Sequence, residues 1–260
     1  FRFQIMFFSK KLKKFKEIKH CFFSKKGGFS KGIYKSLNCG QGSRDKKINI
    51  QKNLNLVLKK IDINSKLALM YQTHSNKVIV IDKKNKNLKK FKSDAIITKQ
   101  KGICLGVVTA DCVPIILYDM QNQIIGCIHA GWKGAVNGII ENTIMKFKKL
   151  NNNNNIIAAV GPCIGFRSYE VDIKFYKNFI SKSKKNKVYF ADKNKNKKIF
   201  NLRKYVNNKL RQLNIKVENI NFDTFKQKNR FFSYRRSQKL GEIDYGRCIS
   251  VVTLSKFSQI

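Results

Sequence analysis

The stretch GICLGVVTADCVPIILYDMQNQIIGCIHA (residues 102–130) decides the fold class of this 260-residue chain. It holds three short apolar runs, ICLGVVT (103–109), VPIILYD (113–119) and QIIGCIHA (123–130), which are separated by a few polar or turn-forming residues. Apolar runs of this length between turn signals predict β-strands. Because these strands follow one another without helices between them, a regular doubly wound sheet of βαβ units is not expected.

Helices and further strands are predicted on both sides of this strand-rich centre. Residues 47–61 carry apolar side chains at helical spacing, which predicts an amphipathic helix. Other helices are expected at 133–149, 172–180 and 201–213. Other strands are expected at 67–72, 77–82, 94–98, 156–160 and 247–254. The pattern predicts a single domain of the mixed α/β (α+β) class, with a mixed sheet or two stacked sheets and helices covering the sheet faces.

The composition is that of a globular protein with a very basic surface. Apolar residues make up 42% of the chain, which is enough for an ordinary core. The 55 Lys and Arg residues against 15 Asp and Glu give a formal net charge of +40, which taken alone indicates a nucleic acid or an anionic membrane as partner. The basic residues are mostly Lys, however, and they are spread along the whole chain. We therefore predict a solvated surface and no specific nucleic-acid partner.

The sequence also bears on the compartment. The N-terminal segment lacks the apolar core of a signal peptide, and the most apolar stretch (102–118) is short for a membrane span and carries Asp111 in its middle. Seven scattered cysteines without CxxC pairs favour a reducing compartment over a disulfide framework. We expect a cytoplasmic protein with no membrane partner. The first methionine is Met6, so one alternative places residues 1–5 upstream of the natural start.

Three side chains that commonly bind metals stand at the ends of predicted strands: His74, Cys112 and His129. Two imidazoles and a thiolate can hold a tetrahedral zinc ion and leave its fourth position open for water or substrate, as catalytic zinc sites do. The spacings of 38 and 17 residues match no local zinc signature. The pattern alone therefore leaves open the alternative of two core histidines and one buried cysteine.

Two further segments indicate binding of an anion. In HAGWKGA (129–135), a predicted strand runs through Gly131 into a predicted helix, whose free N–H groups could bind an anion with help from Lys133. An ordinary β–α turn is the alternative at this position. In FFSYRRS (231–237), Arg235 and Arg236 are adjacent; on a strand they would point to opposite faces, so at most one would serve a given site.

Seven segments of the chain resemble a single protein family, and they do so in the same order. They are FFSKKGGFSKGIYKSLNCG (22–40), QTHSNKV (72–78), SDAIIT (93–98), GVVTADCVPI (106–115), IGCIHAGWKGA (125–135), GPCIGFRSYEV (161–171) and FFSYRRS with DYGR (231–247). The family is the YfiH-type family, also called the peptidoglycan editing factor or multicopper polyphenol oxidase-like family. The resemblance runs from about residue 20 to the C-terminus. It implies an N-terminal extension over 1–19 and a catalytic domain over 20–260.

This resemblance implies a fold, a metal and an activity. The implied fold is a four-layer α/β/β/α sandwich, described as cysteine-hydrolase-like. The implied metal is one zinc ion per chain, bound by His74, Cys112 and His129. The implied activity is that of a purine nucleoside enzyme, which cleaves adenosine, inosine, guanosine and methylthioadenosine with phosphate to the base and (methylthio)ribose 1-phosphate, and which deaminates adenosine. A copper-dependent, laccase-like oxidase activity and a role in cell-wall editing have also been attached to the family.

Five residues on these segments are predicted to bind substrate or phosphate: Lys25, Asn38, Gly131, Lys133 and Arg235. Lys25 and Lys133 stand where the family usually has arginine. A lysine keeps the positive charge but lacks the forked donor geometry that suits phosphate. Asp223-Thr224 stands where the family commonly has Cys-Thr, which alters no predicted metal ligand.

Four functions compete for these residues, and we favour a zinc-dependent purine nucleoside enzyme. In that interpretation Cys112 and His129 act at the zinc ion, and Asp111 is the candidate proton carrier. A cysteine hydrolase acting on cell-wall or peptide material would instead use Cys112 as nucleophile and His129 as base. A multi-copper oxidase would lack histidine ligands, because one copper centre with two histidines leaves only His20 for any further copper ion. A nucleic-acid binder is supported only by the net charge. The sequence leaves the oligomeric state open.

Overall fold

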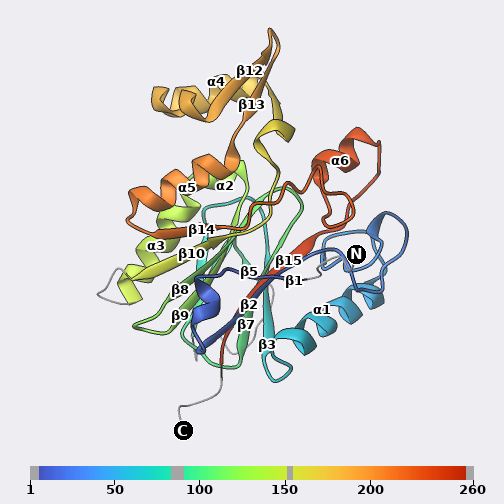
Figure 1. Ribbon diagram of the computed structural model, residues 1–260, viewed down its shortest axis with the longest axis vertical. Coiled ribbons are helices and arrows are strands. Elements are labelled where there is room, and N and C mark those ends of the chain that lie inside the picture. Colours follow the sequence, from blue (N-terminus) through green and yellow to red (C-terminus); the bar gives the residue numbers. More distant parts are fainter. Residues whose placement is uncertain (1–5, 83–90, 151–154, 256–260) are drawn as a thin grey trace.

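Two six-stranded sheets form the centre of the computed structural model, which describes residues 6–82, 91–150 and 155–255 (Figure 1). The first sheet has the order β1 (Met6–Phe7), β2 (Ile18–Phe23), β15 (Cys248–Leu254), β7 (Ile103–Thr109), β3 (Lys66–Tyr71) and β5 (Phe91–Lys92). The second has the order β14 (Lys216–Asn219), β10 (Ile156–Val160), β8 (Val113–Asp119), β9 (Ile124–Ala130), β6 (Ala95–Thr98) and β4 (Val78–Ile81). Both sheets contain parallel and antiparallel pairs, as predicted for a mixed sheet.

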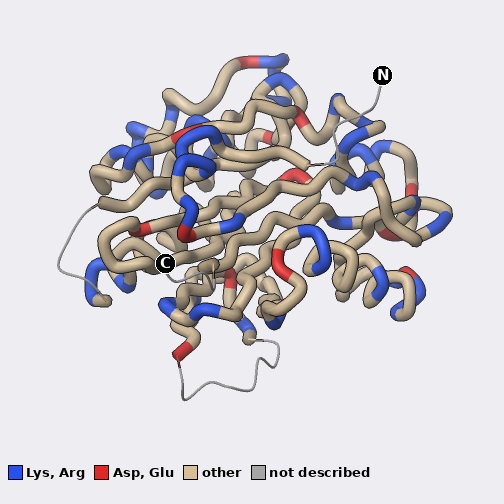
Figure 2. The backbone as a smooth tube through the Cα atoms, turned by 60° about the horizontal axis from the view of Figure 1, so that its bottom comes forward, with Lys and Arg blue, Asp and Glu red and all other residues tan. Residues whose placement is uncertain are grey.

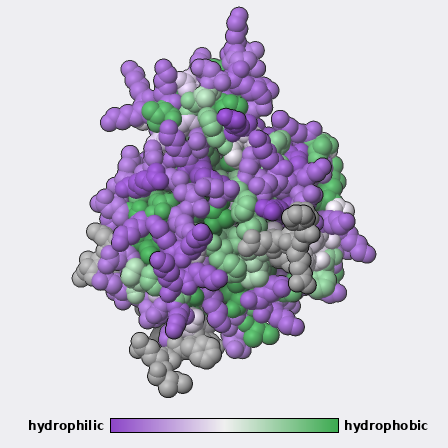
Figure 3. Space-filling view, in the orientation of Figure 1, coloured by the Kyte–Doolittle hydropathy of each residue, from purple (hydrophilic) through white to green (hydrophobic). Residues whose placement is uncertain are grey.

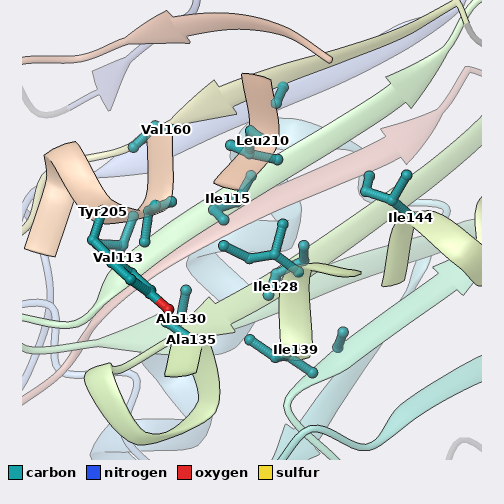
Figure 4. Packing of buried hydrophobic residues seen from close by; sticks show 14 of the residues in the cluster. Val113, Ile115, Ile128, Ala130, Ala135, Ile139, Ile144, Val160, Tyr205 and Leu210 are labelled. Carbon is teal, nitrogen blue, oxygen red and sulfur yellow. The ribbon is translucent and has the colours of Figure 1, made fainter. Parts of the chain in front are cut away.

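The two sheets are stacked, and helices cover their outer faces. Buried side chains of α1 (Lys47–Ile61) pack with those of β2 and β15 on the first sheet. On the second sheet, α2 (Trp132–Val136), α3 (Ile139–Leu150) and α5 (Leu202–Gln212) pack against β8, β9 and β10 (Figure 4). A third apolar cluster fills the space between the sheets. The layer order is therefore α/β/β/α, which confirms the predicted four-layer sandwich.

Strand β8 shows why the central strands are apolar throughout rather than alternating. Val113, Ile115 and Leu117 belong to the cluster beneath the helices, whereas Ile116 and Tyr118 belong to the cluster between the sheets. Successive side chains of a strand point to opposite faces, and both faces of this strand are covered. All seven residues of β8 are buried as a result.

Strands β2, β12 (Phe190–Asn194), β13 (Lys197–Phe200) and β14 were not predicted from the sequence, and two predicted features differ in the structure. The single helix predicted at 133–149 is split into α2 and α3, because Gly138 between them has φ of +89° and so interrupts the right-handed helix. The segment 231–237 is not a strand. It leads into α6 (Tyr234–Lys239), whose N-cap Ser233 accepts a hydrogen bond from the Arg236 N–H.

A small third sheet projects from the body of the molecule, at the top of Figure 1. It consists of β11 (Glu170–Asp172), β13 (Lys197–Phe200) and β12 (Phe190–Asn194), and α4 (Ile173–Lys182) packs beside it. Short 3-10 turns complete the described elements: η1 (Leu12–Lys14), η2 (Gly32–Tyr34), η4 (Phe166–Ser168) and η5 (Lys184–Tyr189).

The N-terminal segment packs on the rest of the chain. Strand β1 pairs with β2, and Leu12 between them is completely buried. The predicted boundary between residues 19 and 20 falls inside β2. Residues 1–5, which one alternative places before the natural start, lie outside the described residues.

The basic residues are distributed over the whole surface rather than gathered in one stripe (Figure 2). The face shown in Figure 3 is mostly hydrophilic, with smaller hydrophobic areas between the polar side chains. All seven cysteines lie in the described ranges, and all are free thiols. A search of the described residues found no helix with the length and apolar character needed to cross a membrane.

Candidate metal centre

The three predicted ligands come together because strand ends from both sheets meet at one end of the sandwich. Cys112 immediately precedes β8, and His129 is the penultimate residue of the antiparallel neighbour β9. The register pairs Val113 with Ala130, which brings the start of β8 beside the end of β9. His74 lies in the connection between β3 of the first sheet and β4 of the second. This connection reaches the same end of the second sheet.

The donor atoms of these residues are close enough to share one ion. The ligand atoms of His74, Cys112 and His129 all lie within 4.8 Å of one another, and this is the one such group of three or more found in the described part of the chain. Cys112 Sγ is 3.8 Å from His74 Nε2. The two imidazole rings meet edge to face, with centroids 4.8 Å apart. The alternative of two unrelated core histidines does not fit this clustering.

Asp94, which directly precedes β6, orders both histidines. Its side chain is fully buried, and Oδ1 accepts hydrogen bonds from His129 Nδ1 at 2.8 Å and from the His74 backbone N–H at 3.0 Å. Oδ2 accepts from Ser75 N at 2.6 Å and from Ser75 Oγ at 2.7 Å. Since Nδ1 of His129 is engaged, its Nε2 is left for a metal, as in carboxylate–histidine–zinc arrangements. Burial alone would raise the pKa of Asp94, but the hydrogen bonds from His129 and Ser75 lower it to about 2.

The electrostatic environment favours the thiolate of Cys112. Burial would raise the pKa of this thiol, but the imidazoles of His129 and His74 outweigh burial and lower it to about 6. Conversely, burial would lower the pKa of His129, but Cys112 and Asp94 raise it to about 9. A thiolate is the form of cysteine that binds a metal, so the metal-free site already holds one ligand in its binding form.

Gly131 leaves room for this ligand cluster. A Cβ at this position would lie 2.6 Å from His74 Cδ2 and 3.0 Å from Cys112 Sγ, which is too close. The backbone here therefore has to be glycine for the two side chains to sit beside it. Two imidazole nitrogens and one thiolate sulfur are a donor set suited to zinc, and also to copper. The residues present fit a single transition-metal ion.

Asp111 fixes the turn that presents Cys112. Its backbone has φ of +85°, and its buried carboxylate accepts hydrogen bonds from Thr224 Oγ1 at 2.6 Å, Ser233 Oγ at 2.9 Å and Arg235 N at 2.7 Å. Burial raises the pKa of this carboxyl group above its usual value. The carboxylate thus ties the turn to the start of α6.

Two cavities flank the ligand cluster, and both are lined by His74, Ala110 and Cys112. The first, of about 290 Å³, is called here the arginine cavity; its wall also includes His129, Tyr245 and Arg247. The second, of about 300 Å³, is called the aromatic cavity. Its wall includes Trp132, Tyr169, Phe175, Tyr234, Asp111, Glu170, Asp172 and Arg235.

The other predicted substrate residues are placed differently. Arg235 lines the aromatic cavity, with its guanidinium over the Tyr169 ring. Its neighbour Arg236 turns away and donates to the carbonyl oxygens of Thr224, Phe225 and Phe231, so only one of the two arginines faces a cavity, as expected, although on a helix.

The remaining predicted residues, Lys25, Lys133 and Asn38, line neither cavity. Lys25 lies over the Phe232 ring, and burial lowers its pKa. Lys133 is exposed, with Nζ 5.6 Å from the Trp132 ring centroid. Asn38 is fully buried and accepts hydrogen bonds from the backbone N–H groups of Gly40 and Arg247.

Three residues of the site were not predicted as such: Asp94, Tyr169 and Arg247. Each lies within a segment that carries the family resemblance, SDAIIT, GPCIGFRSYEV and DYGR respectively. Asp94 stands directly before an apolar strand, as Cys112 does, and this position was the available signal. The ring of Tyr169 meets Arg235, and the side chain of Arg247 packs on Gly40, so both placements depend on chain segments far away in the sequence.

Fold and site together define a class of protein: a layered α/β/β/α domain with a His-Cys-His group at the strand ends that could hold a metal ion. The family described as multi-copper polyphenol oxidoreductase laccase matches residues 19–255, and the chain belongs to this family, the YfiH type. A Rickettsia prowazekii protein called purine nucleoside phosphorylase is 38% identical over 173 residues, which cover 66% of this chain and 71% of that protein. A Haemophilus influenzae protein of the same description is 31% identical over 223 residues, covering 85% and 89%. The crystal structure of the Bacillus licheniformis protein YfiH superposes with a TM-score of 0.86 at 22% identity, covering 96% of each chain, and supports the fold.

Proposed function

We propose that this protein is a zinc-dependent purine nucleoside phosphorylase that also deaminates adenosine. The observation that carries the proposal is the position of the His74, Cys112 and His129 cluster between two cavities, each large enough for part of a two-substrate complex. Relatives described as purine nucleoside phosphorylases, at up to 38% identity, support the phosphorylase activity. The expected substrates are adenosine, inosine, guanosine and methylthioadenosine, together with phosphate. Seven free thiols support a reducing, cytoplasmic setting.

The side chains of this site have separate tasks. His74, Cys112 and His129 would hold the zinc ion, and Asp94 orients the two histidines. Zinc bound there would supply Lewis acidity and a water molecule with a pKa lowered towards 7. The aromatic rings around the second cavity offer flat faces on which a purine can stack. Asp111 positions Cys112 through its three hydrogen bonds, and its role as proton carrier stays a prediction.

Product analysis tests both activities. Purified, zinc-loaded protein is incubated with inosine, with and without phosphate, and hypoxanthine and ribose 1-phosphate are quantified by chromatography. Phosphate-dependent release of both products is expected. A parallel incubation with adenosine should yield inosine by deamination and adenine by phosphorolysis. Absence of hypoxanthine from inosine plus phosphate would contradict the phosphorylase assignment.

A cysteine hydrolase is the second candidate, because the Cys112 thiol has a pKa lowered to about 6 beside a histidine. The two candidates compete for the same sulfur, since a thiolate bound to zinc is a poor nucleophile. The Cys112→Ser variant distinguishes the two candidates. Either enzyme would lose activity on this substitution, but only the zinc enzyme would also lose its bound zinc. Full zinc occupancy in an inactive Cys112→Ser variant would favour the hydrolase.

A multi-copper oxidase is disfavoured by the number of histidines. The chain has three, and the third, His20, is buried in β2, where its Nε2 accepts a hydrogen bond from Ser9 N at 2.9 Å. One copper ion could occupy the His-Cys-His group. Metal analysis of protein from cells supplied with zinc and copper together would show which metal the site selects.

A further inference from the structure

The two cavities differ in charge, although they share the ligand cluster as a common wall. Three carboxylate residues, Asp111, Glu170 and Asp172, contribute to the aromatic cavity. The arginine cavity has no Asp or Glu among the residues that line it, and its one permanently charged group is Arg247. The arginine cavity therefore favours an anionic substrate, whereas the charges of the aromatic cavity are mixed, with Arg235 beside the three carboxylates and Glu170 paired with lysines.

The guanidinium of Arg247 has donors to spare. Among the residues that the structure describes, it hydrogen-bonds only to Tyr245, with NH1 3.3 Å from the Tyr245 carbonyl oxygen, and it makes no ion pair. The carboxylate of the neighbouring Asp244 accepts hydrogen bonds from Tyr34 Oη and Arg44 N, and Arg247 acts on it through its charge, which helps to lower the pKa of Asp244. A guanidinium carries five N–H donors, so most remain available to a ligand.

Arg247 is also held in place before any ligand binds. Its Cζ lies 4.2 Å from the Tyr245 ring centroid, and its side chain packs so closely on Gly40 that a Cβ there would lie 2.9 Å from Cδ. Asn38 Oδ1 accepts hydrogen bonds from both Arg247 N at 2.9 Å and Gly40 N at 3.0 Å. Such pre-organisation lowers the entropic cost of binding an oxyanion with a forked donor.

By contrast, Arg235 in the aromatic cavity is committed to the protein. Its NH1 donates to the carbonyl oxygen of Glu170, and its guanidinium stacks on Tyr169. It therefore forms part of the cavity wall beside the aromatic rings rather than a free anion site.

We infer that Arg247 binds inorganic phosphate in the arginine cavity, while the nucleoside occupies the aromatic cavity on the other side of the ligand cluster. This inference rests on the proposed phosphorylase function. In the reaction, the ribose C1′ has to reach the residues that both cavities share, which are His74, Ala110 and Cys112. There a phosphate oxygen forms the new bond to C1′, and the electron pair of the broken glycosidic bond leaves with the purine. The proton of hydrogen phosphate ends on the purine nitrogen. Arg247 thus takes the role that the sequence suggested for Lys25 and Lys133, which line neither cavity.

The test compares Michaelis constants for phosphate and for inosine in the full-length, zinc-loaded protein. Wild-type activity is established first, because its absence would refute the proposed function rather than this inference. In Arg247→Met, the KM for phosphate should rise about tenfold to a hundredfold through loss of charged hydrogen bonds, while the KM for inosine changes less than about twofold. Arg247→Lys, which keeps the charge and packing volume, should give a smaller increase and covers the case in which Arg247→Met does not fold.

Two matched variants and a binding experiment complete the design. Arg235→Met should raise the KM for inosine more than the KM for phosphate. Arg211→Met removes one exposed charge of α5, away from both cavities, and should change neither. Calorimetric titration with inorganic phosphate alone should show binding to the wild type that is weakened in Arg247→Met.

Three results would overturn the inference: an unchanged phosphate KM in Arg247→Met, an equal rise in both Michaelis constants, or an equal effect of Arg211→Met. A fourth comparison excludes a nucleotide phosphate as the natural occupant. If inosine 5′-monophosphate binds more tightly than inosine without added phosphate, and this gain disappears in Arg247→Met, Arg247 serves a nucleotide and not free phosphate.

Discussion

Two histidines of this protein are almost equally buried in β-strands, and yet their pKa values are shifted in opposite directions. His20 in β2 is 4% exposed and His129 in β9 is 3% exposed. Burial, helped by Lys13, lowers the pKa of His20 to about 4 despite the opposing effect of Glu218. In His129 the effect of burial is outweighed by Cys112 and Asp94, which raise the pKa to about 9.

The difference shows that the partners, and not the burial, make a histidine part of a functional site. His20 is neutral and accepts a single hydrogen bond from the backbone N–H of Ser9, which ties the N-terminal segment to the first sheet. His129 has a carboxylate on one ring nitrogen and a thiolate near the other. Because His20 makes a structural hydrogen bond and His129 belongs to the candidate metal site, their replacement should have separable effects.

The largest expected effect is loss of the metal on removal of a ligand. We expect zinc affinity to fall by more than about a hundredfold in each of the variants His129→Ala, Cys112→Ala and His74→Ala. Loss of a ligand should lower the affinity more than loss of a hydrogen-bond partner of that ligand, which costs about tenfold to a hundredfold. The apo proteins should stay folded, because the core is built from apolar packing between four layers. Zinc per chain by atomic absorption and circular dichroism check both points. His20→Asn is the matched control and should keep its zinc; an equal loss there would remove the distinction between the two histidines.

The next effect concerns stability in acid. The pKa of His20 is lowered from 6.5 to about 4, so its unfolded form binds a proton between these values while the folded form does not. Its contribution to stability is therefore complete above pH 6.5 and is lost as pH falls to about 4, by about 3 kcal/mol at most.

Urea unfolding of metal-free protein at pH 7 and pH 4.5 measures this loss. His20→Asn, which cannot titrate, should lose less stability than the wild type over the same interval. Identical losses in the two proteins would show that His20 does not titrate as its environment predicts.

Removing the carboxylate beside His129 should have a smaller effect on the metal than removing a ligand. The asparagine in Asp94→Asn keeps one oxygen acceptor, but it cannot accept the hydrogen bonds from His129, Ser75 and the His74 backbone together. Zinc affinity is expected to fall about tenfold to a hundredfold, as for other hydrogen-bond partners of metal-bound histidines. Competition with a chelating dye measures this affinity. Wild-type affinity in Asp94→Asn would mean that the strands alone orient His129.

The smallest expected effect on zinc affinity comes from a steric change beside the ligands, with all three ligands kept. Gly131→Ala would place a Cβ 2.6 Å from His74 Cδ2, and His74, which is exposed, must shift. We expect zinc affinity to fall on the order of tenfold, since overpacking typically costs about 1–3 kcal/mol. Gly42→Ala, which meets nothing within 4 Å, is the control. An unaltered zinc affinity in Gly131→Ala would show that the site adapts to the added methyl group.

The sequence alone predicted stacked or mixed sheets covered by helices, and it singled out three candidate metal ligands. The runs at 103–109, 113–119 and 123–130 became β7, β8 and β9 to within a residue, because a strand buried on both faces has to be apolar throughout. The three ligands stood out because histidine is scarce in this chain and because each of them stands at or just beyond a strand end.

Only the tertiary structure decided which polar residues serve those ligands and the cavities beside them. Helix α6 begins at residue 234 because Ser233 caps it and Asp111, more than a hundred residues away, accepts a hydrogen bond from Arg235 N. Arg247 lines a cavity because Asn38 holds its backbone, and the lysines predicted for phosphate lie outside both cavities. Apolar periodicity is a local property that can be read along the chain, whereas hydrogen-bond partners are set by segments that meet only when the sheets stack.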